Sequence, residues 1–137
     1  MITTLITEAP ICATALADSL KSDTAGATVT FSGDVRNNDG ERTVFSLTYE
    51  IHPTAKVVLG DIVNRISLKH NILGVSAAHR YGQIPIGESA FVVVVTAKHR
   101  GPAFAACQEI VEVVKEELPI WKHQVFDDGT DEWVNSA

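Results

Sequence analysis

Hydrophobic and polar residues alternate along two stretches in the first half of the chain, residues 27–36 and 43–51. Such alternation is typical of strands with one buried face, because successive side chains point to opposite sides of a sheet. The segment Asn37-Asn38-Asp39-Gly40 between the two stretches has the composition of a turn. We therefore expect these two strands to form an antiparallel hairpin with a longer loop.

The rest of the chain mixes strand and helix patterns. Residues 90–97 are apolar almost throughout, which predicts a central strand covered on both faces. Residues 82–88 contain Pro85 and Gly87 and are expected to be a loop. The other patterns predict strands at 2–7, 75–81 and 121–126, and helices at 10–20, 53–70 and 102–117. This mixed order predicts an α+β fold rather than a doubly wound parallel sheet.

The bulk composition indicates one globular domain, residues 1–137. No apolar run approaches the roughly 20 residues that span a bilayer, and the N-terminus lacks the pattern of a signal peptide, so no membrane partner is expected. Only two cysteines occur, without metal-ligand spacing, so we expect a reducing, cytoplasmic location and no bound metal. The formal charge of -6 argues against a nucleic-acid partner.

A concentrated basic group, Lys98-His99-Arg100, stands directly before the predicted helix that starts near Pro102. The first turn of a helix has unpaired N–H groups and a partial positive charge, so it favours acidic neighbours. Basic residues there cost stability unless an anion binds among them, and helix N-termini are natural sites for phosphate or carboxylate. On an acidic chain, this group predicts a small anionic ligand.

Two lysines near the end of that helix, and one arginine earlier in the chain, are further candidates. Lys115 falls at the edge of the apolar stripe, where a lysine either extends its amine to water or presents it to a pocket wall. Lys122 approaches the same site if the strand that carries it runs back beside the helix. Arg36 ends a predicted strand and is either solvated or functional. The predicted stripe consists of Phe104, Cys107, Val111, Val114 and Leu118.

Neither the cysteines nor the other histidines indicate a further chemistry. Cys107 lies on the apolar stripe and is expected to be a small core residue, and Cys12 has no basic neighbours to favour the thiolate. His52, His70 and His79 lack metal-ligand spacing, so we expect them to be structural or surface residues.

Five groups of short motifs then occur in a recognisable order. They are Thr30-Phe31-Ser32-Gly33-Asp34-Val35-Arg36-Asn37, Leu47-Thr48-Tyr49-Glu50, His79-Arg80-Tyr81-Gly82, Ala97-Lys98-His99-Arg100, and Lys115 with Pro119-Ile120-Trp121-Lys122. In this order the motifs closely resemble those of the large, catalytic subunit of molybdopterin synthase. The resemblance runs from about residue 26 to residue 133, and the joint occurrence of the motifs is specific.

The resemblance implies an α/β hammerhead fold with an additional antiparallel β-sheet. It also implies a central homodimer in which each large subunit takes a small ubiquitin-like sulfur-carrier subunit, giving a heterotetramer. The carrier's C-terminal Gly-Gly thiocarboxylate would enter the active site and deliver two sulfurs, converting cyclic pyranopterin monophosphate to molybdopterin in molybdenum cofactor biosynthesis. Such a sulfurtransferase needs no cofactor and no reactive cysteine, because the sulfur arrives on the carrier.

The resemblance further implies which residues bind the substrate. Arg36, His99 and Arg100 match substrate-binding positions, and we expect them to hold the phosphate and the pterin through charge-assisted hydrogen bonds. Asp34 stands where some relatives have lysine, so no phosphate contact is expected of it.

The remaining implied site residues lie near the C-terminus. Lys115 and Lys122 match the two active-site lysines of the family. Lys115 is expected to be the essential acid/base group, and Lys122 to position the thiocarboxylate or stabilise developing negative charge. His123 and Gln124 fall in the family's binding segments and are expected to contact the substrate. The cationic and imidazole groups of this set should line one cavity.

Two other functions compete with the enzyme. A noncatalytic adaptor would bind a ubiquitin-like tail without converting the pterin, and would tolerate Lys115→Ala. A small-anion binding or regulatory module would bind phosphate ligands without a thiocarboxylate partner. The joint occurrence of the basic motifs in the family's order favours the enzyme.

Overall fold

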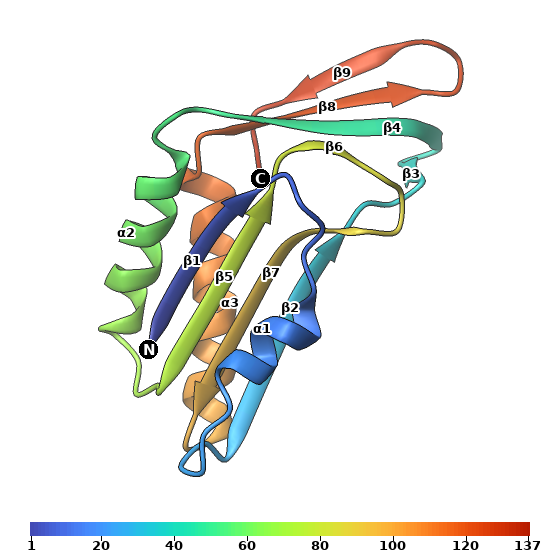
Figure 1. The fold of residues 1–137 in the computed structure, drawn as a ribbon. Helices are drawn as coiled ribbons and strands as arrows, with labels where there is room; N and C mark the ends of the chain where they lie inside the picture. The colour runs from blue at the N-terminus through green and yellow to red at the C-terminus, as the bar shows by residue number, and fades with distance from the viewer.

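Two β-sheets set across one another form the framework of the protein, for which a computed structural model describes residues 1–137 (Figure 1). The first sheet contains, in spatial order, β1 (Ile2–Thr7), β5 (Gly74–Arg80), β7 (Ser89–Ala97) and β2 (Ala27–Asp34). The β1 strand runs parallel to β5, and the other two pairings are antiparallel.

The second sheet lies across the upper end of the first in Figure 1. It contains, in order, β3 (Asn38–Asp39), β4 (Arg42–Ile51), β8 (Ile120–Phe126) and β9 (Asp131–Val134), with β6 (Gly82–Ile84) paired to β4. All of its pairings are antiparallel. The fold is therefore of the α+β class, as the mixed order of elements predicts.

Helices cover both faces of the first sheet. The α2 helix (Ala55–Ser67) and the α3 helix (Arg100–Glu117) pack on one face, and the short α1 helix (Ala13–Ser19) lies against the other face over β7 and β2 (Figure 1). Every residue of β5 is buried, as is every residue of β7 after Ser89. The prediction of a central strand at 90–97 is confirmed. None of the three helices has the length and continuous apolarity needed to cross a membrane.

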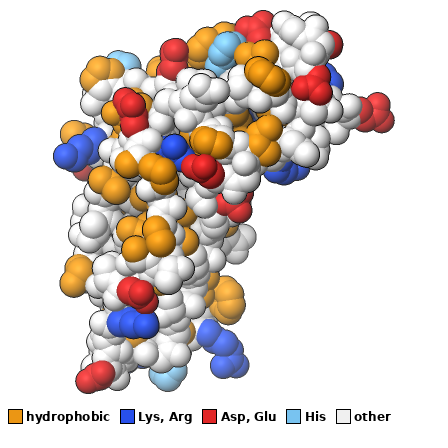
Figure 2. All heavy atoms as spheres, turned by 45° about the vertical axis from the view of Figure 1, so that its right-hand side comes forward, with side chains coloured by type: hydrophobic (Ala, Val, Ile, Leu, Met, Phe, Trp, Pro, Cys, Tyr) orange, Lys and Arg blue, Asp and Glu red, His pale blue; other side chains and the backbone are white.

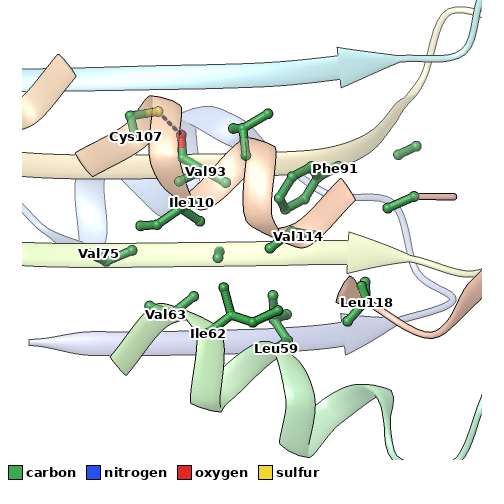
Figure 3. Packing of buried hydrophobic residues seen from close by; sticks show 14 of the residues in the cluster. Leu59, Ile62, Val63, Val75, Phe91, Val93, Cys107, Ile110, Val114 and Leu118 are labelled. Atoms are coloured by element: carbon green, nitrogen blue, oxygen red, sulfur yellow. Dashed lines mark hydrogen bonds between the residues drawn. The ribbon is translucent and has the colours of Figure 1, made fainter. Parts of the chain in front are cut away.

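The main core lies between this sheet and the two long helices. Figure 3 shows side chains from α2, including Leu59 and Ile62, meeting side chains from α3, including Ile110 and Val114, over β5 and β7. The predicted stripe on α3 is confirmed for four of its residues. Its first member, Phe104, is instead 61% exposed. The reason is its position beside the edge strand β2, where no further strand covers the helix.

The predicted hairpin between residues 27–36 and 43–51 is wrong. The strand β2 pairs with β7, and β4 pairs with β8, so consecutive strands enter different sheets. The chain leaves the first sheet at the buried Val35, whose N–H donates to the carbonyl oxygen of Glu88 and whose carbonyl accepts from the N–H of Gly87. Alternation predicts a strand and its buried face, but it carries no information about which strand is the neighbour.

Smaller differences concern the ends of elements. The 82–88 segment is not entirely a loop, because β6 occupies its first three residues. The α3 helix begins at Arg100, two residues before Pro102, and α1 begins at Ala13 rather than at Pro10. Gly26 brings the start of β2 close to the start of α3, since a Cβ there would lie 2.4 Å from the Lys98 carbonyl oxygen.

Candidate functional site

A cavity of about 190 Å³ lies where the end of the first sheet meets the second sheet. Its wall is formed by β2 and the segment after it, by strands β3, β4, β5, β7 and β8, by the last turn of α3 and by Ala137. Its apolar lining comes largely from Phe31, Leu47, Tyr49 and Phe91. Its polar and charged lining consists of Asp34, Arg36, Asn38, Asp39, His79, Lys115, Lys122 and Gln124.

Three cations of the predicted site reach this cavity from three different elements. Arg36 directly follows Val35, which is anchored between the two sheets. Lys115 lies in the last turn of α3, where a cation is favoured by the partial negative charge of the helix end. Its Nζ donates to the carbonyl oxygen of Ala137 at 3.4 Å. Lys122 lies on β8, directly opposite Tyr49 of β4.

Two carboxylates partly balance these charges. The Oδ1 atom of Asp34 accepts from the Ser32 hydroxyl at 2.6 Å and from the Ser89 hydroxyl at 2.8 Å. These two hydrogen bonds, that from Ser32 first, lower the pKa of Asp34, so the group stays ionised at neutral pH. Asp39 accepts from the Gln124 side-chain amide at 2.9 Å. Among the side chains of the lining, three cations face two carboxylates, which leaves one positive charge and suits an anion.

Alternation along β8 divides its candidate residues between two faces. Lys122 and Gln124 point into the cavity, and Gln124 is buried there by its contact with Asp39. His123 lies on the opposite face, where its Nε2 pairs with Asp131 at 2.8 Å and its ring stacks on Trp133 at 4.3 Å. Within this chain, His123 therefore does not join the cavity, because neighbouring residues of a strand face opposite ways.

The basic group at the start of α3 is far from this cavity in the same chain. His99 and Arg100 are exposed at the lower end of α3 in Figure 1, whereas Lys115 is at its upper end. Fifteen residues of helix separate Arg100 from Lys115, which corresponds to about 22 Å. The expectation that all the basic groups line one cavity is therefore not met within a single chain.

One residue of the cavity was expected to have only a structural or surface role. His79, at the end of β5, is 1% exposed and borders the cavity beside Tyr49 and Phe91. Burial, the largest cause, lowers the pKa of His79 to about 4 and raises the pKa of Tyr49 to about 12. In the sequence, only its place in the His79-Arg80-Tyr81-Gly82 motif singled out His79. The sequence did not indicate its contact with the second sheet.

No group of three or more His, Cys, Asp and Glu side chains is arranged to hold a metal ion. The cations, carboxylates and one neutral imidazole of the cavity can bind an anion, move protons and stabilise developing negative charge.

A comparison with family models gives the decisive observation: the model described as MoaE protein matches residues 6–117. The chain belongs to the MoaE protein family. The resemblance inferred from the short motifs is thereby confirmed.

Individual relatives agree with the MoaE assignment. The chain is 42% identical over 129 residues to the molybdopterin synthase catalytic subunit of Aspergillus niger, a match that covers 93% of this chain and 72% of the relative. It is 36% identical over 129 residues to the protein of the same name from Thermoplasma volcanium, covering 93% of this chain and 94% of the relative.

Solved structures confirm the fold expected of a MoaE protein. Molybdopterin synthase from Staphylococcus aureus superposes with a TM-score of 0.86 at 30% identity, covering 94% of each chain. At 20% identity and a TM-score of 0.71, the same fold occurs in a protein–protein complex of subunits 1 and 2 of molybdopterin-converting factor from Helicobacter pylori.

Proposed function

We propose that this chain is the catalytic subunit of a molybdopterin synthase. In this function it converts cyclic pyranopterin monophosphate to molybdopterin, using two sulfurs delivered as the C-terminal thiocarboxylate of a small carrier protein. The observation that carries the proposal is the convergence of Arg36, Lys115 and Lys122 on one cavity from three separate elements. Membership of the MoaE family supports the same reaction.

Arg36, Lys115 and Lys122 have separate roles in this proposal. Arg36 binds the phosphate of the substrate, since a guanidinium makes two parallel hydrogen bonds to such an anion. Lys115 moves protons at the reacting carbons during sulfur addition. Lys122 holds the thiocarboxylate and stabilises the negative charge that develops on it. Gln124, held by Asp39 at 2.9 Å, presents a fixed amide beside them.

A second copy of the chain completes the site by supplying His99 and Arg100. The edge of β2 is unpaired in the first sheet, and an apolar groove beside it is lined by Val29, Phe31 and the exposed Phe104. Figure 2 shows hydrophobic side chains exposed on the side of the molecule that carries this edge. An unpaired edge next to exposed apolar surface is suited to another chain.

Two-fold symmetry at this edge has a specific consequence. One end of β2 lies beside Ala97, next to the Lys98-His99-Arg100 group, and the other end leads into Arg36. An axis through the middle of β2 exchanges these two ends. The basic group of each copy is thereby brought toward the cavity of the other copy, which agrees with its separation of about 22 Å from Lys115 along its own helix.

The small carrier is the remaining partner in this proposal. Its C-terminal tail, a carboxylate or thiocarboxylate, matches the positive cavity in charge. A complex of two subunits in a Helicobacter pylori protein of the same fold supports this partnership. Both cysteines of the chain are free, which supports a reducing compartment such as the cytoplasm.

The test is a conversion assay with cyclic pyranopterin monophosphate and a thiocarboxylated carrier, in which dithiolene formation is measured. Wild-type protein should form the product, and Lys115→Ala should not. Lys56→Ala serves as a control, because Lys56 is an exposed helical lysine outside the cavity. Tail binding without conversion by the wild type would indicate a noncatalytic adaptor, and normal turnover by Lys115→Ala would remove Lys115 from the mechanism.

A further inference from the structure

His79 has the only buried side-chain nitrogen or oxygen atom in the protein that lacks a hydrogen-bond partner, its Nε2. A buried acceptor left unpaired destabilises the fold, so native structures usually satisfy such atoms. The ring belongs to the wall of the cavity that holds Lys115 and Lys122. Nε2 itself has almost no exposed surface, so a donor that enters the cavity reaches it by displacing the side chains that cover it.

The surrounding contacts determine which form of the ring is present. Nδ1 lies 2.8 Å from the carbonyl oxygen of Arg80, and a carbonyl can only accept, so Nδ1 carries the proton. In a neutral imidazole the other nitrogen, Nε2, is then a hydrogen-bond acceptor. The ring stays neutral at physiological pH, since burial lowers its pKa to about 4 and the nearby Lys115 charge acts in the same direction. His79 therefore presents Nε2 as a hydrogen-bond acceptor.

The ring is also fixed in orientation. Its plane stacks on Phe91 with a centroid distance of 5.3 Å, and it meets Tyr49 edge to face at 5.0 Å. The stack, the edge contact and the Nδ1 hydrogen bond leave little freedom for the ring to turn. An acceptor held this firmly discriminates between ligands by geometry.

The other polar groups of the cavity explain what His79 adds. Arg36, Lys115 and Lys122 offer only donors, which suit a phosphate or a carboxylate. The carboxylate of Asp34 accepts from two serine hydroxyls, and that of Asp39 accepts from Gln124. Both carboxylates are charged and already hold a partner, whereas Nε2 of His79 is an uncharged acceptor that holds none. A ligand that carries N–H donors as well as an anion, as a pterin phosphate does, can use such an acceptor.

We propose that His79 is a substrate-recognition residue, whose Nε2 accepts a hydrogen bond from an N–H group of the pterin bound in the cavity. This inference rests on the proposed function, because it takes the pterin as the substrate. The cations recognise the anionic part of the substrate, and His79 recognises its uncharged ring. A phosphate ester without such a donor leaves Nε2 unpaired and binds less tightly.

The test compares two substitutions in the full-length protein. In His79→Asn the side-chain amide takes the place of Nδ1–H toward Arg80 but does not reach the position of Nε2. In His79→Gln the amide reaches that position and can present an oxygen. We expect the Kd for cyclic pyranopterin monophosphate to rise about fivefold to tenfold in His79→Asn, the value of one neutral hydrogen bond, and to recover partly in His79→Gln.

Inorganic phosphate is the matched ligand control, because it has no N–H donor. Its affinity should be the same in wild type and both variants, and the Tm of each variant should be recorded alongside. Equal pterin affinity in all three proteins overturns the inference. A parallel loss of phosphate binding and Tm, or a fall in kcat with unchanged Kd, also overturns it in favour of a structural role or an action through Lys115.

The two proposals fail in distinguishable ways. If the wild type binds and converts the pterin while His79→Asn binds it equally well, only the inference about His79 is wrong. If the wild type binds the pterin more tightly than His79→Asn does, and yet makes no dithiolene, only the proposed reaction is wrong. A wild type that does not bind the pterin contradicts both.

Discussion

The two ends of α3 carry basic residues in opposite electrostatic settings. At the C-terminal end, Lys115 lies where the helix end is partly negative, and it borders a cavity formed by two sheets. At the N-terminal end, His99 and Arg100 are exposed, stand against the partial positive charge, and form no ion pair with a carboxylate. Lys115 therefore borders a pocket of its own chain, whereas His99 and Arg100 form a charged group without a carboxylate partner.

This difference is what the proposed division of the site between two copies of the chain requires. Cations that oppose the helix charge are retained at a cost in stability of roughly 0.3–1 kcal/mol each. A bound anion offsets that cost, and the cavity of a second copy is where the proposed anion lies. Lys115 is therefore positioned by the fold of its own chain, whereas His99 and Arg100 would reach a cavity only when two copies assemble.

Mixing two inactive variants gives the largest expected effect and tests this division directly. Lys115→Ala and Arg100→Ala should each lose activity alone, the first by about 10²–10⁴-fold. In a mixed dimer, one site carries both changes and the other carries neither. Random mixing should therefore restore about a quarter of wild-type dithiolene formation, since half the dimers are mixed and each has one intact site.

If Arg100 instead acted on the cavity of its own chain, every site in a mixed dimer would carry one change. Activity after mixing would then stay at the level of the separate variants. The measurement needs exchange of subunits, which is checked by labelling one variant and recovering the mixed dimer.

Phe104→Glu tests the surface through which the second copy is proposed to bind. A carboxylate in the apolar groove beside β2 is costly to bury, so the dimer should dissociate and dithiolene formation should fall with it. We expect at least a tenfold rise in the dimer Kd, roughly 1.4 kcal/mol, measured by sedimentation. Phe45→Glu is the matched control: Phe45 is 69% exposed on β4, away from the groove. An equal effect of both substitutions would contradict this assignment of the surface.

His123 and Gln124 provide a smaller contrast within one strand. Gln124→Ala should weaken substrate binding severalfold, because it removes a buried amide of the cavity and leaves Asp39 without its partner. His123→Ala should change substrate affinity less than twofold, because its ring contacts Asp131 and Trp133 on the other face. Titration with cyclic pyranopterin monophosphate measures both. A larger loss in His123→Ala would restore that residue to the binding site.

Local patterns in the sequence predicted the parts of this molecule that local forces determine. The stripe of Cys107, Val111, Val114 and Leu118 was correct because helical period and burial are linked within one element. The pairing of β2 was not predictable from alternation, because the choice of β7 depends on contacts more than 50 residues away.

For the candidate site, too, the sequence predicted what local motifs determine but not what depends on distant contacts. Motifs predicted Arg36, Lys115 and Lys122 as site residues, and these meet at one cavity. The motifs did not indicate whether His99 serves the cavity of its own chain or that of a second copy, because this depends on how two copies assemble. They also did not reveal the unpaired nitrogen of His79, which arises from packing between the two sheets.

The smallest predicted effect exchanges the charge at each end of α3. Arg100→Glu should raise the free energy of unfolding of the dissociated chain by about 0.3–1 kcal/mol, because an anion in the first turn complements the helix charge. Lys115→Glu should lower it by a similar amount at the other end. Urea denaturation in the Phe104→Glu background measures both without the second copy. Arg100→Glu should at the same time weaken phosphate binding in the dimer, because it replaces one of the cations proposed to hold the anion. Destabilisation of the dissociated chain by Arg100→Glu would show that this arginine already stabilises its own chain, and the difference between the two ends would disappear.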